Sequence, residues 1–375
     1  MLTIALVTVV SVSLFVAIEW FNDERQSILE FFVGVELGYG NVSDGKALIA
    51  KVKNYTNLFV IAPSVITKNE TMLNEVCDYA YDAGLSFLVY FTRIHAQGAQ
   101  AGFYYHPSVW IMKAREKYGD RFLGVYYFDE PGGNQLDAGS FRMVEEAENY
   151  MESAETYVEK VYDEIEYYLN SSARVFTADY GLYWFDYKAR YDTVLAEFGW
   201  NHSRQLHVAL CRGAAKVQNK DWGVIVTWTY WHPPYIESED ELYEDLVLAY
   251  RAGAKYVVIF DYPKISEYGI LTDKHFEALE KFWNYINNNP RKHGTLKGEV
   301  AYVLPQDYGF GFRSSSDTVW GLWNADDLSE KIWGDVNNLL DRYGSRLDVV
   351  YSDPEFNNVI KSCYNKLILW NETAT

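Results

Sequence analysis

The sequence predicts a (β/α)8 TIM barrel followed by a small α/β piece. From Phe31 onward, short apolar segments alternate with amphipathic helical stretches, which is the pattern of βα units in a parallel sheet. Several apolar segments end in acidic or aromatic residues, and a parallel barrel keeps its functional groups at these carboxyl ends of its strands. The length of 375 residues accommodates one barrel of about 250 residues and a further piece.

Eight segments have the composition of buried strands, and eight strands joined by right-handed helical crossovers close into a barrel. Capping signals support the helices between them: three acidic residues follow Ser238 in a first turn, and Gly84 ends another helix. The stretch Asp137–Leu169 is charged and periodic and predicts one extended helix or two. The expected strands are Phe31–Leu37, Leu58–Ala62, Ser86–Thr92, Phe122–Phe128, Arg174–Asp179, Thr193–Phe198, Val224–Trp228 and Tyr256–Asp261.

After Pro290 the alternation starts again. Strands are expected at Gly298–Leu304, Leu347–Tyr351 and Lys366–Trp370, with a helix at Asp326–Tyr343. This βαβαβ run predicts a small Rossmann-like or flavodoxin-like piece beside the barrel. The sequence ends directly after the third strand, which leaves open whether the piece is complete.

The chain is therefore divided into an N-terminal segment (1–25), a barrel expected to be catalytic (26–292) and a C-terminal appendage (293–375). Leu2–Ile18 is uncharged and apolar, with a length between that of a signal-peptide core and that of a membrane anchor. A buried barrel helix is the alternative. Six Asn-x-Ser/Thr sequons favour a glycoprotein, so we expect a secreted protein or one anchored on the outer face of the cell membrane through this segment alone.

Composition excludes several classes of function. The net charge of −19 argues against binding to nucleic acid, whose phosphates need a basic surface. The seven His have no metal-ligand spacing and no Gly-rich phosphate loop is present, so we expect neither a metal nor a cofactor. The three Cys are expected to be free apolar thiols, with one disulfide pair as the alternative. Aromatic residues make up 17% of the chain, which suits either stacking on sugar rings or an aromatic core. The sequence does not indicate an oligomeric state.

The segment Gly124–Gly133 is the most informative one. An aromatic strand runs into two adjacent carboxylates, Asp129 and Glu130, before Pro-Gly-Gly. Glycoside hydrolysis needs two carboxyl groups, one protonated and one ionised. Asp129-Glu130-Pro131 resembles the Asn-Glu-Pro at the fourth strand of clan A glycoside hydrolases, except that Asp replaces Asn. The resemblance implies that Glu130 is the acid/base; a helix-capping acid pair is the alternative.

The segment Ala196–Trp200 contains the expected partner. Glu197-Phe198-Gly199 resembles the Glu-Phe-Gly element that carries the nucleophile in the same clan. In that clan the element ends the seventh strand, whereas here it ends the sixth expected strand. The resemblance implies that Glu197 acts as nucleophile or base.

Other strand ends would form the rest of the site, because the carboxyl ends of all barrel strands face one mouth. Asp129, Asp179 and Asp261 are expected to hold sugar hydroxyls, and Trp228 and Tyr127 to stack on sugar rings. Arg212 is expected on a helix surface; the alternatives are that it orients a carboxylate or binds an acidic sugar. The complete set of expected substrate-binding residues is Asp129, Tyr127, Glu36, Asp179, Trp228, Trp231, Asp261 and Arg93.

Taken together, the sequence predicts an extracellular glycoside hydrolase that acts on an oligosaccharide or polysaccharide. The alternative from another class is a non-catalytic glycan-binding or cell-envelope surface protein on the same barrel. A polysaccharide lyase or transglycosylase is a second alternative.

Overall fold

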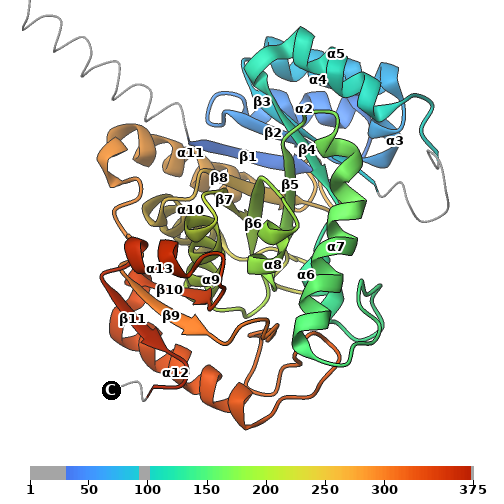
Figure 1. Cartoon of the computed structure of the whole chain (residues 1–375). Helices are drawn as coiled ribbons and strands as arrows, with labels where there is room; N and C mark the ends of the chain where they lie inside the picture. Colours follow the sequence, from blue (N-terminus) through green and yellow to red (C-terminus); the bar gives the residue numbers. More distant parts are fainter. Residues whose placement is uncertain (1–30, 93–101, 373–375) are drawn as a thin grey trace, which may run out of the picture.

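The computed structural model describes residues 31–92 and 102–372. Eight parallel strands form a closed barrel in which β1 to β8 follow one another in sequence order and β8 pairs with β1, as Figure 1 shows. The barrel prediction is confirmed. Its strands are β1 (Phe32–Leu37), β2 (Leu58–Ile61), β3 (Ser86–Phe91), β4 (Phe122–Tyr127), β5 (Val175–Asp179), β6 (Thr193–Phe198), β7 (Asp221–Val226) and β8 (Tyr256–Asp261).

Helices surround the barrel, and side-chain caps begin many of them. Ser238 accepts from the backbone N–H of Glu241, whose own carboxylate accepts from the N–H of Ser238, so two otherwise unpaired N–H groups are satisfied. The helices are α2 (Val42–Val52), α3 (Ser64–Thr67), α4 (Glu70–Asp82), α5 (Pro107–Tyr118), α6 (Pro131–Leu136), α7 (Tyr150–Leu169), α8 (Tyr183–Lys188), α9 (Arg204–Val217), α10 (Glu239–Ala252), α11 (Asp273–Asn288), α12 (Asp327–Tyr343) and α13 (Asn357–Cys363), with short 3-10 turns η2 (Gly119–Arg121), η3 (Pro290–Lys292) and η4 (Gly344–Arg346).

Two element predictions are corrected. Strand β7 begins at Asp221 and ends at Val226, earlier than expected at both ends. Beyond its end, the carbonyl of Trp228 accepts from the backbone N–H of Trp200 in the loop that follows β6. The expected helix over Asp137–Leu169 begins only at Tyr150. Residues 137–149 are irregular, and several of their backbone groups bond to side chains of the flanking helices: Val144 to Gln135 on α6 and Met143 to Lys160 on α7.

The C-terminal sheet is confirmed as a separate unit of three parallel strands. Its strands are β9 (Val300–Leu304), β10 (Leu347–Tyr351) and β11 (Lys366–Leu369), in the order β10-β9-β11. If β9 is counted as the first strand, the order β10-β9-β11 becomes 2-1-3, which is the order with which a flavodoxin-like sheet begins. In Figure 1 it is the orange-to-red part beside α9.

Side chains alternate between the inside of the barrel and the layer under the helices, as the two-residue period of a strand requires. On β4, Tyr126 belongs to the interior cluster, whereas Tyr127 lies in the layer shared with the helices. The buried members of the interior cluster are Leu58, Val60, Leu88, Tyr126, Phe176, Ala178, Leu195, Ile225, Tyr256 and Val258.

Arg212 on α9 joins the barrel to the C-terminal sheet. It is 5% exposed, and its Nε lies 2.8 Å from Asp348 on β10. Its other nitrogens donate to the carbonyls of Leu296, Ser345 and Leu347 at 2.6 to 3.1 Å. The expected helix-surface position is wrong, because Arg212 is buried between two packed units; the alternative that it orients a carboxylate is confirmed by its pairing with Asp348.

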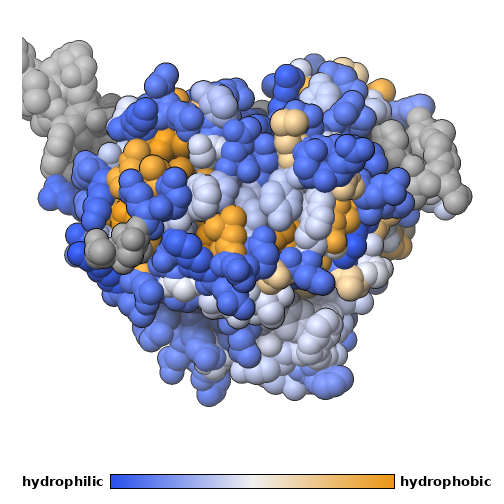
Figure 2. All heavy atoms as spheres, turned by 60° about the horizontal axis from the view of Figure 1, so that its bottom comes forward, coloured by the Kyte–Doolittle hydropathy of each residue, from blue (hydrophilic) through white to orange (hydrophobic). Residues whose placement is uncertain are grey.

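The exterior agrees with the acidic composition. Figure 2 shows a face dominated by hydrophilic residues, with hydrophobic areas separated from one another by polar ones. All three cysteines are free, as expected. Within residues 31–92 and 102–372, no helix has the length and apolar character needed to cross a membrane. The expected signal or anchor at 1–25 lies outside the described residues.

We expect Arg212→Ala to reduce the free energy of unfolding by about 3–5 kcal/mol, because Asp348 would remain buried without its cation. Urea unfolding followed by fluorescence measures this loss. The exposed Lys361 on α13 provides the control, since a surface Lys→Ala change shifts stability by about 0.5 kcal/mol or less. Similar midpoints for the two variants would contradict the role of Arg212.

Candidate functional site

A pocket of about 300 Å³ opens at the carboxyl ends of the barrel strands. Strand ends from opposite sides of the barrel line it, so residues far apart in sequence meet there. The lining combines four carboxyl groups with aromatic rings, which is the composition expected of a sugar-binding site. The lining residues are Glu36, Tyr126, Asp129, Glu130, Glu197, Trp200, Ile225, Thr227, Trp228, Phe260 and Tyr262.

The loop after β4 is held in place by Asp179 at the end of β5. Its two carboxylate oxygens accept from the backbone N–H groups of Gly132, Gly133, Tyr180 and Gly181 at 2.5 to 3.0 Å. A Cβ at Gly132 would lie 2.5 Å from the Gly181 carbonyl, and one at Gly133 would lie 2.2 Å from the Tyr180 ring. The Pro-Gly-Gly sequence therefore permits a close approach that any larger residue would block.

Glu130 itself has a left-handed backbone conformation, with φ of 51°. A non-glycine residue rarely adopts this conformation unless its surroundings impose it, and such residues gather at functional sites. Asn134 imposes it here, because its Nδ2 donates to the Glu130 carbonyl at 2.7 Å and to the Asp129 carbonyl at 3.1 Å. The main chain thus fixes where the Glu130 side chain begins.

Glu197 lies at the end of β6 and is 5% exposed. A Cβ at the following Gly199 would lie 2.2 Å from the Thr227 hydroxyl, so glycine is needed for the β6 and β7 loops to meet. The next residue, Trp200, donates its backbone N–H to the Trp228 carbonyl at 2.8 Å. The structure confirms that Glu197 ends the sixth strand and differs here from the clan A position.

The carboxyl groups of Glu130 and Glu197 are near enough to each other for each to affect the pKa of the other. Burial, reinforced by the charge of Asp129, raises the pKa of Glu130 to about 8. Burial and the adjacent Glu130 raise the pKa of Glu197 well above its usual range. Two carboxyl groups that interact in a poorly solvated site cannot both ionise readily, so near neutral pH the pair retains a proton.

Glu36 and Asp129 complete the set of carboxyl groups. Burial raises the pKa of Asp129 to about 6, although the Tyr126 hydroxyl, which donates to it, opposes this shift. Burial and the neighbouring Asp129 raise the pKa of Glu36 well above its usual range. Both side chains line the pocket, as the sequence predicted.

Aromatic rings form one wall of the pocket. Trp228 lies parallel to Tyr262, with ring centroids 6.1 Å apart, and its Nε1 donates to the Tyr262 carbonyl at 2.6 Å. Trp200 contacts Trp231 with centroids 4.3 Å apart. Trp231 is 72% exposed and does not itself line the pocket, so it extends the aromatic wall toward solvent.

Arg204 holds the two loops that carry these rings. Its Nη1 donates to the Gly199 carbonyl at 2.7 Å. Its Nη2 and Nε pair with Glu237 and Asp245, each at 2.8 Å. The loop with Trp200 and the loop that ends at Glu237 are therefore joined through one buried cation.

Trp231 and three further predicted substrate-binding residues do not line the pocket. Tyr127 is fully buried under α7 and its hydroxyl donates to Glu164 at 3.3 Å, because it points out of the barrel. Asp179 has no exposed surface and its oxygens are occupied by backbone N–H groups. Asp261 also points outward and accepts from Ile270 N at 2.7 Å. Arg93 lies outside the described residues.

Five polar or aromatic pocket residues were not predicted: Tyr126, Trp200, Thr227, Phe260 and Tyr262. The two-residue period of the strands could have found two of them. Tyr126 precedes Tyr127 by one position and Phe260 precedes Asp261 by one, so the inward-facing set was shifted by one residue. The others follow strand ends, where the period no longer applies.

The C-terminal piece contacts the loop that follows Glu130. Arg313 pairs with Asp137, which also accepts from the Tyr180 hydroxyl at 2.8 Å. Gln135 on α6 donates to the Trp320 carbonyl at 2.8 Å. The appendage therefore supports α6 from the side opposite the pocket.

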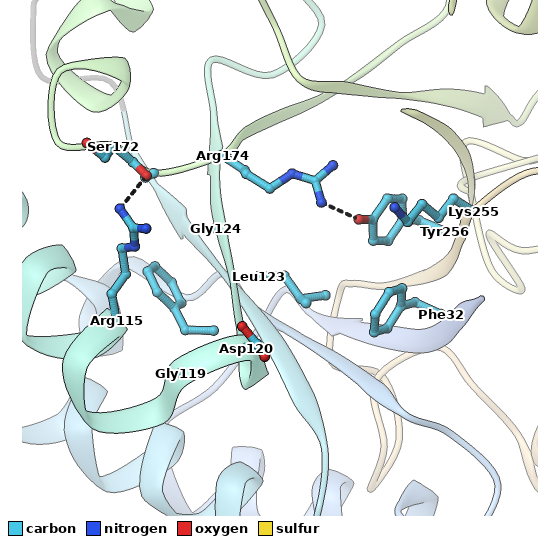
Figure 3. Close-up of a pocket in the computed structure, with 12 residues that line it drawn as sticks. Phe32, Arg115, Gly119, Asp120, Leu123, Gly124, Ser172, Arg174, Lys255 and Tyr256 are labelled. Atoms are coloured by element: carbon cyan, nitrogen blue, oxygen red, sulfur yellow. Dashed lines mark hydrogen bonds between the residues drawn. The ribbon is translucent and has the colours of Figure 1, made fainter. Parts of the chain in front are cut away.

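A larger cavity, of about 640 Å³, lies at the amino ends of the strands, as Figure 3 shows. There Arg115 points to a backbone carbonyl and Arg174 to Tyr256. Arg174 and Lys255 also share Asp221, at 2.5 and 2.9 Å. Because these cations already have partners within the protein, and the amino-terminal face of a barrel serves stability, we place the candidate site in the smaller pocket.

The described residues contain no group of three acidic, His or Cys side chains arranged to hold a metal ion. The four carboxyl groups of the pocket can donate and accept protons, which is what general acid–base catalysis needs.

Comparison with known proteins gives a likeness in structure only. No protein-family model matches the sequence, and no curated protein matches it. The α-L-fucosidase isoenzyme 2 from Paenibacillus thiaminolyticus is similar in structure, with a TM-score of 0.52 and 11% identity over 90% of this chain and 60% of that one. A psychrophilic family 10 endo-β-1,4-xylanase gives 0.44, with 14% identity over 68% and 96% of the two chains.

A glycoside hydrolase family 5 enzyme from Prevotella bryantii B14 gives a TM-score of 0.43, with 10% identity over 69% of this chain and 98% of that one. The likeness is one of fold. The match to the fucosidase, at 11% identity, supports the (β/α)8 fold and nothing finer. The chain spans 60% of the fucosidase's length, and sequence identities this low do not carry over a reaction or a substrate.

We expect Glu130→Gln to be more stable than the unchanged protein at about pH 8 and equally stable at about pH 4. Folded Glu130 keeps its proton until about pH 8, whereas an unfolded Glu loses it near pH 4.3. Between these values the folded state binds more protons, so its stability falls as pH rises, by about 1.4 kcal/mol per unit of pKa difference. Because Gln does not ionise, the Glu130→Gln variant does not lose this stability as the pH rises.

Urea unfolding at several pH values measures the difference. The exposed Glu116 on α5 is the control, and Glu116→Gln should follow the unchanged protein at every pH. Parallel stability curves for Glu130→Gln and the unchanged protein would show that Glu130 titrates normally.

Proposed function

We propose that this protein is a glycoside hydrolase that cleaves an oligosaccharide or polysaccharide, with Glu130 and Glu197 as its two catalytic carboxyl groups. The observation that carries the proposal is the proximity of these buried groups in a pocket that also has an aromatic wall. Hydrolysis of a glycosidic bond requires one proton donor and one carboxylate within a few ångström. A pair that retains one proton near neutral pH meets both needs.

The roles are those that the sequence resemblance implies. Glu130 follows β4 and is partly exposed, whereas Glu197 is almost completely buried. Glu130 protonates the oxygen of the leaving sugar as the C1–O bond breaks, and the Glu197 carboxylate bonds to C1. Water then attacks C1, gives its proton to Glu130 and releases Glu197. Trp228 and Tyr262 supply flat faces for the sugar.

Replacement of either carboxyl group tests the proposal. Glu130→Gln and Glu197→Gln should each lower the rate of glycan hydrolysis by about 10²–10⁴ or more and leave glycan binding within a few fold. Release of reducing ends from a polysaccharide panel measures the first quantity, and isothermal titration calorimetry the second. Glu116→Gln is the control with full activity.

A glycan-binding protein without activity would show equal binding and no turnover in the unchanged protein and in both variants. That result would favour the non-catalytic alternative. Rescue by azide would separate the roles, since azide replaces a missing nucleophile with inversion at C1 and a missing acid/base with retention.

The product should keep the anomeric configuration of the substrate. If Glu197 is the nucleophile, it bonds to C1 and water then displaces it, so two inversions at C1 give net retention; an inverting enzyme instead places water between carboxyl groups about 6.5–9.5 Å apart. Proton NMR during the first minutes of hydrolysis identifies the anomer released. An initially inverted product would contradict the assignment of Glu197 as nucleophile.

Action outside the cell is also part of the proposal. It rests on the apolar segment Leu2–Ile18 and on the sequons, of which Asn41, Asn54, Asn170, Asn201 and Asn371 are exposed. Polysaccharides of cell surfaces would then be accessible to the enzyme.

A further inference from the structure

The pocket holds two more carboxyl groups than the proposed hydrolysis uses. Glu130 and Glu197 carry out the reaction, and Glu36 and Asp129 remain beside them. Among the described residues that line the pocket, every other side chain is uncharged. The pocket therefore presents acidic groups to its ligand, and its described lining has no cation to balance them.

Glu36 provides a second and independent sign of a ligand. The side chain is 5% exposed and lines the pocket. Its Oε2 has no hydrogen-bond partner among residues 31–92 and 102–372. Buried polar atoms nearly always have a partner, so an unpaired carboxylate oxygen facing a pocket indicates that a donor arrives with the ligand.

The donor is better supplied by an organic cation than by a metal. In the described part of the chain no three acidic, His or Cys groups are placed to hold a metal ion. The adjacent faces of Trp228, Trp200 and Tyr262 attract organic cations through their ring electrons and stack on sugar rings. A ligand with both a sugar ring and a positive group fits acids and rings together.

We propose, on the basis of the hydrolase function above, that the sugar bound in this pocket is an amino sugar with a free ammonium group, held by Glu36 and Asp129. An ammonium has three N–H donors, enough for the unpaired Glu36 oxygen and the Asp129 carboxylate. Sugars that carry carboxylate or sulfate groups are excluded by repulsion from the same acids. Neutral sugars bind through hydroxyl groups alone and more weakly.

The ammonium group also explains how so many acids can share one site. Burial and the charge of the neighbouring Asp129 raise the pKa of Glu36, since no cation among the described lining residues stabilises its ionised form. A bound cation stabilises the ionised form, so binding releases a proton from the site. The ligand and the acids would then neutralise each other.

Isothermal titration calorimetry at about pH 6 tests the inference, since amines titrate near or above neutral pH. The probes are matched oligosaccharides of one length and linkage that differ only in a free amine, an N-acetyl group, a hydroxyl group or a carboxylate. Gluco- and galacto-configured sets are both used. We expect the free amine form to bind about tenfold or more tightly than its N-acetyl and hydroxyl forms, and the carboxylate form not to bind.

Glu36→Gln should remove this preference, so that the amine and hydroxyl forms bind within about twofold of each other. Asp129→Asn should also reduce the preference for the amine form. Agreement between the two variants would show that the result with Glu36→Gln does not come from a folding defect. Glu116→Gln, an exposed acid far from the pocket, should keep the preference and so controls for attraction of amines to the −19 surface.

Equal binding of the amine and hydroxyl forms overturns the inference, as does a preference that survives in Glu36→Gln. Absence of binding by every amino oligosaccharide overturns it as well. Hydrolysis of neutral glycans with no amine preference would leave the proposed function standing and reject this substrate. Specific binding of amino oligosaccharides without hydrolysis would support this inference and reject the proposed hydrolase function.

Discussion

The site depends on one buried carboxylate that is not itself in the pocket. Asp179 accepts four backbone N–H groups from the loops after β4 and β5. Those bonds fix the residues that follow Glu130, and with Asn134 they hold it in a conformation that a flexible loop would not keep. Preorganisation of this kind places a carboxyl group within the tolerance that catalysis demands. Without the Asp179 contacts, Glu130 would be an ordinary loop acid.

The second constraint is electrostatic. Four carboxyl groups converge in a pocket with little solvent, and each of them titrates above its normal range. Such a cluster opposes folding at high pH, because every ionised member repels the others. Proteins keep destabilising groups of this kind where they have a use. The barrel tolerates them because its interior cluster and helices stabilise the remainder of the fold.

The sequence predicted the fold closely and the site in part. Seven of the eight strands end or begin within one residue of expectation, because βα alternation is a strong signal. Glu36, Asp129, Glu130, Glu197 and Trp228 were correctly expected at the mouth. Tyr127 and Asp261 were wrong because the direction of a side chain depends on the phase of the strand, which shifts where the chain leaves the sheet. The role of Asp179 depends on contacts between two loops, for which only the adjacent glycines gave a signal.

The C-terminal sheet then has a structural explanation. Arg212 fixes it to α9, the helix between β6 and β7, and Arg313 and Trp320 reach from it to the loop and helix that follow Glu130. The appendage thus contacts the supports of β4 and β6, the strands that lead to Glu130 and Glu197. In a barrel whose mouth concentrates unfavourable charge, the loops after these strands are the parts most in need of outside support. The arrangement makes the sheet part of the site's framework, because its contacts limit how far the two carboxyl groups can move apart.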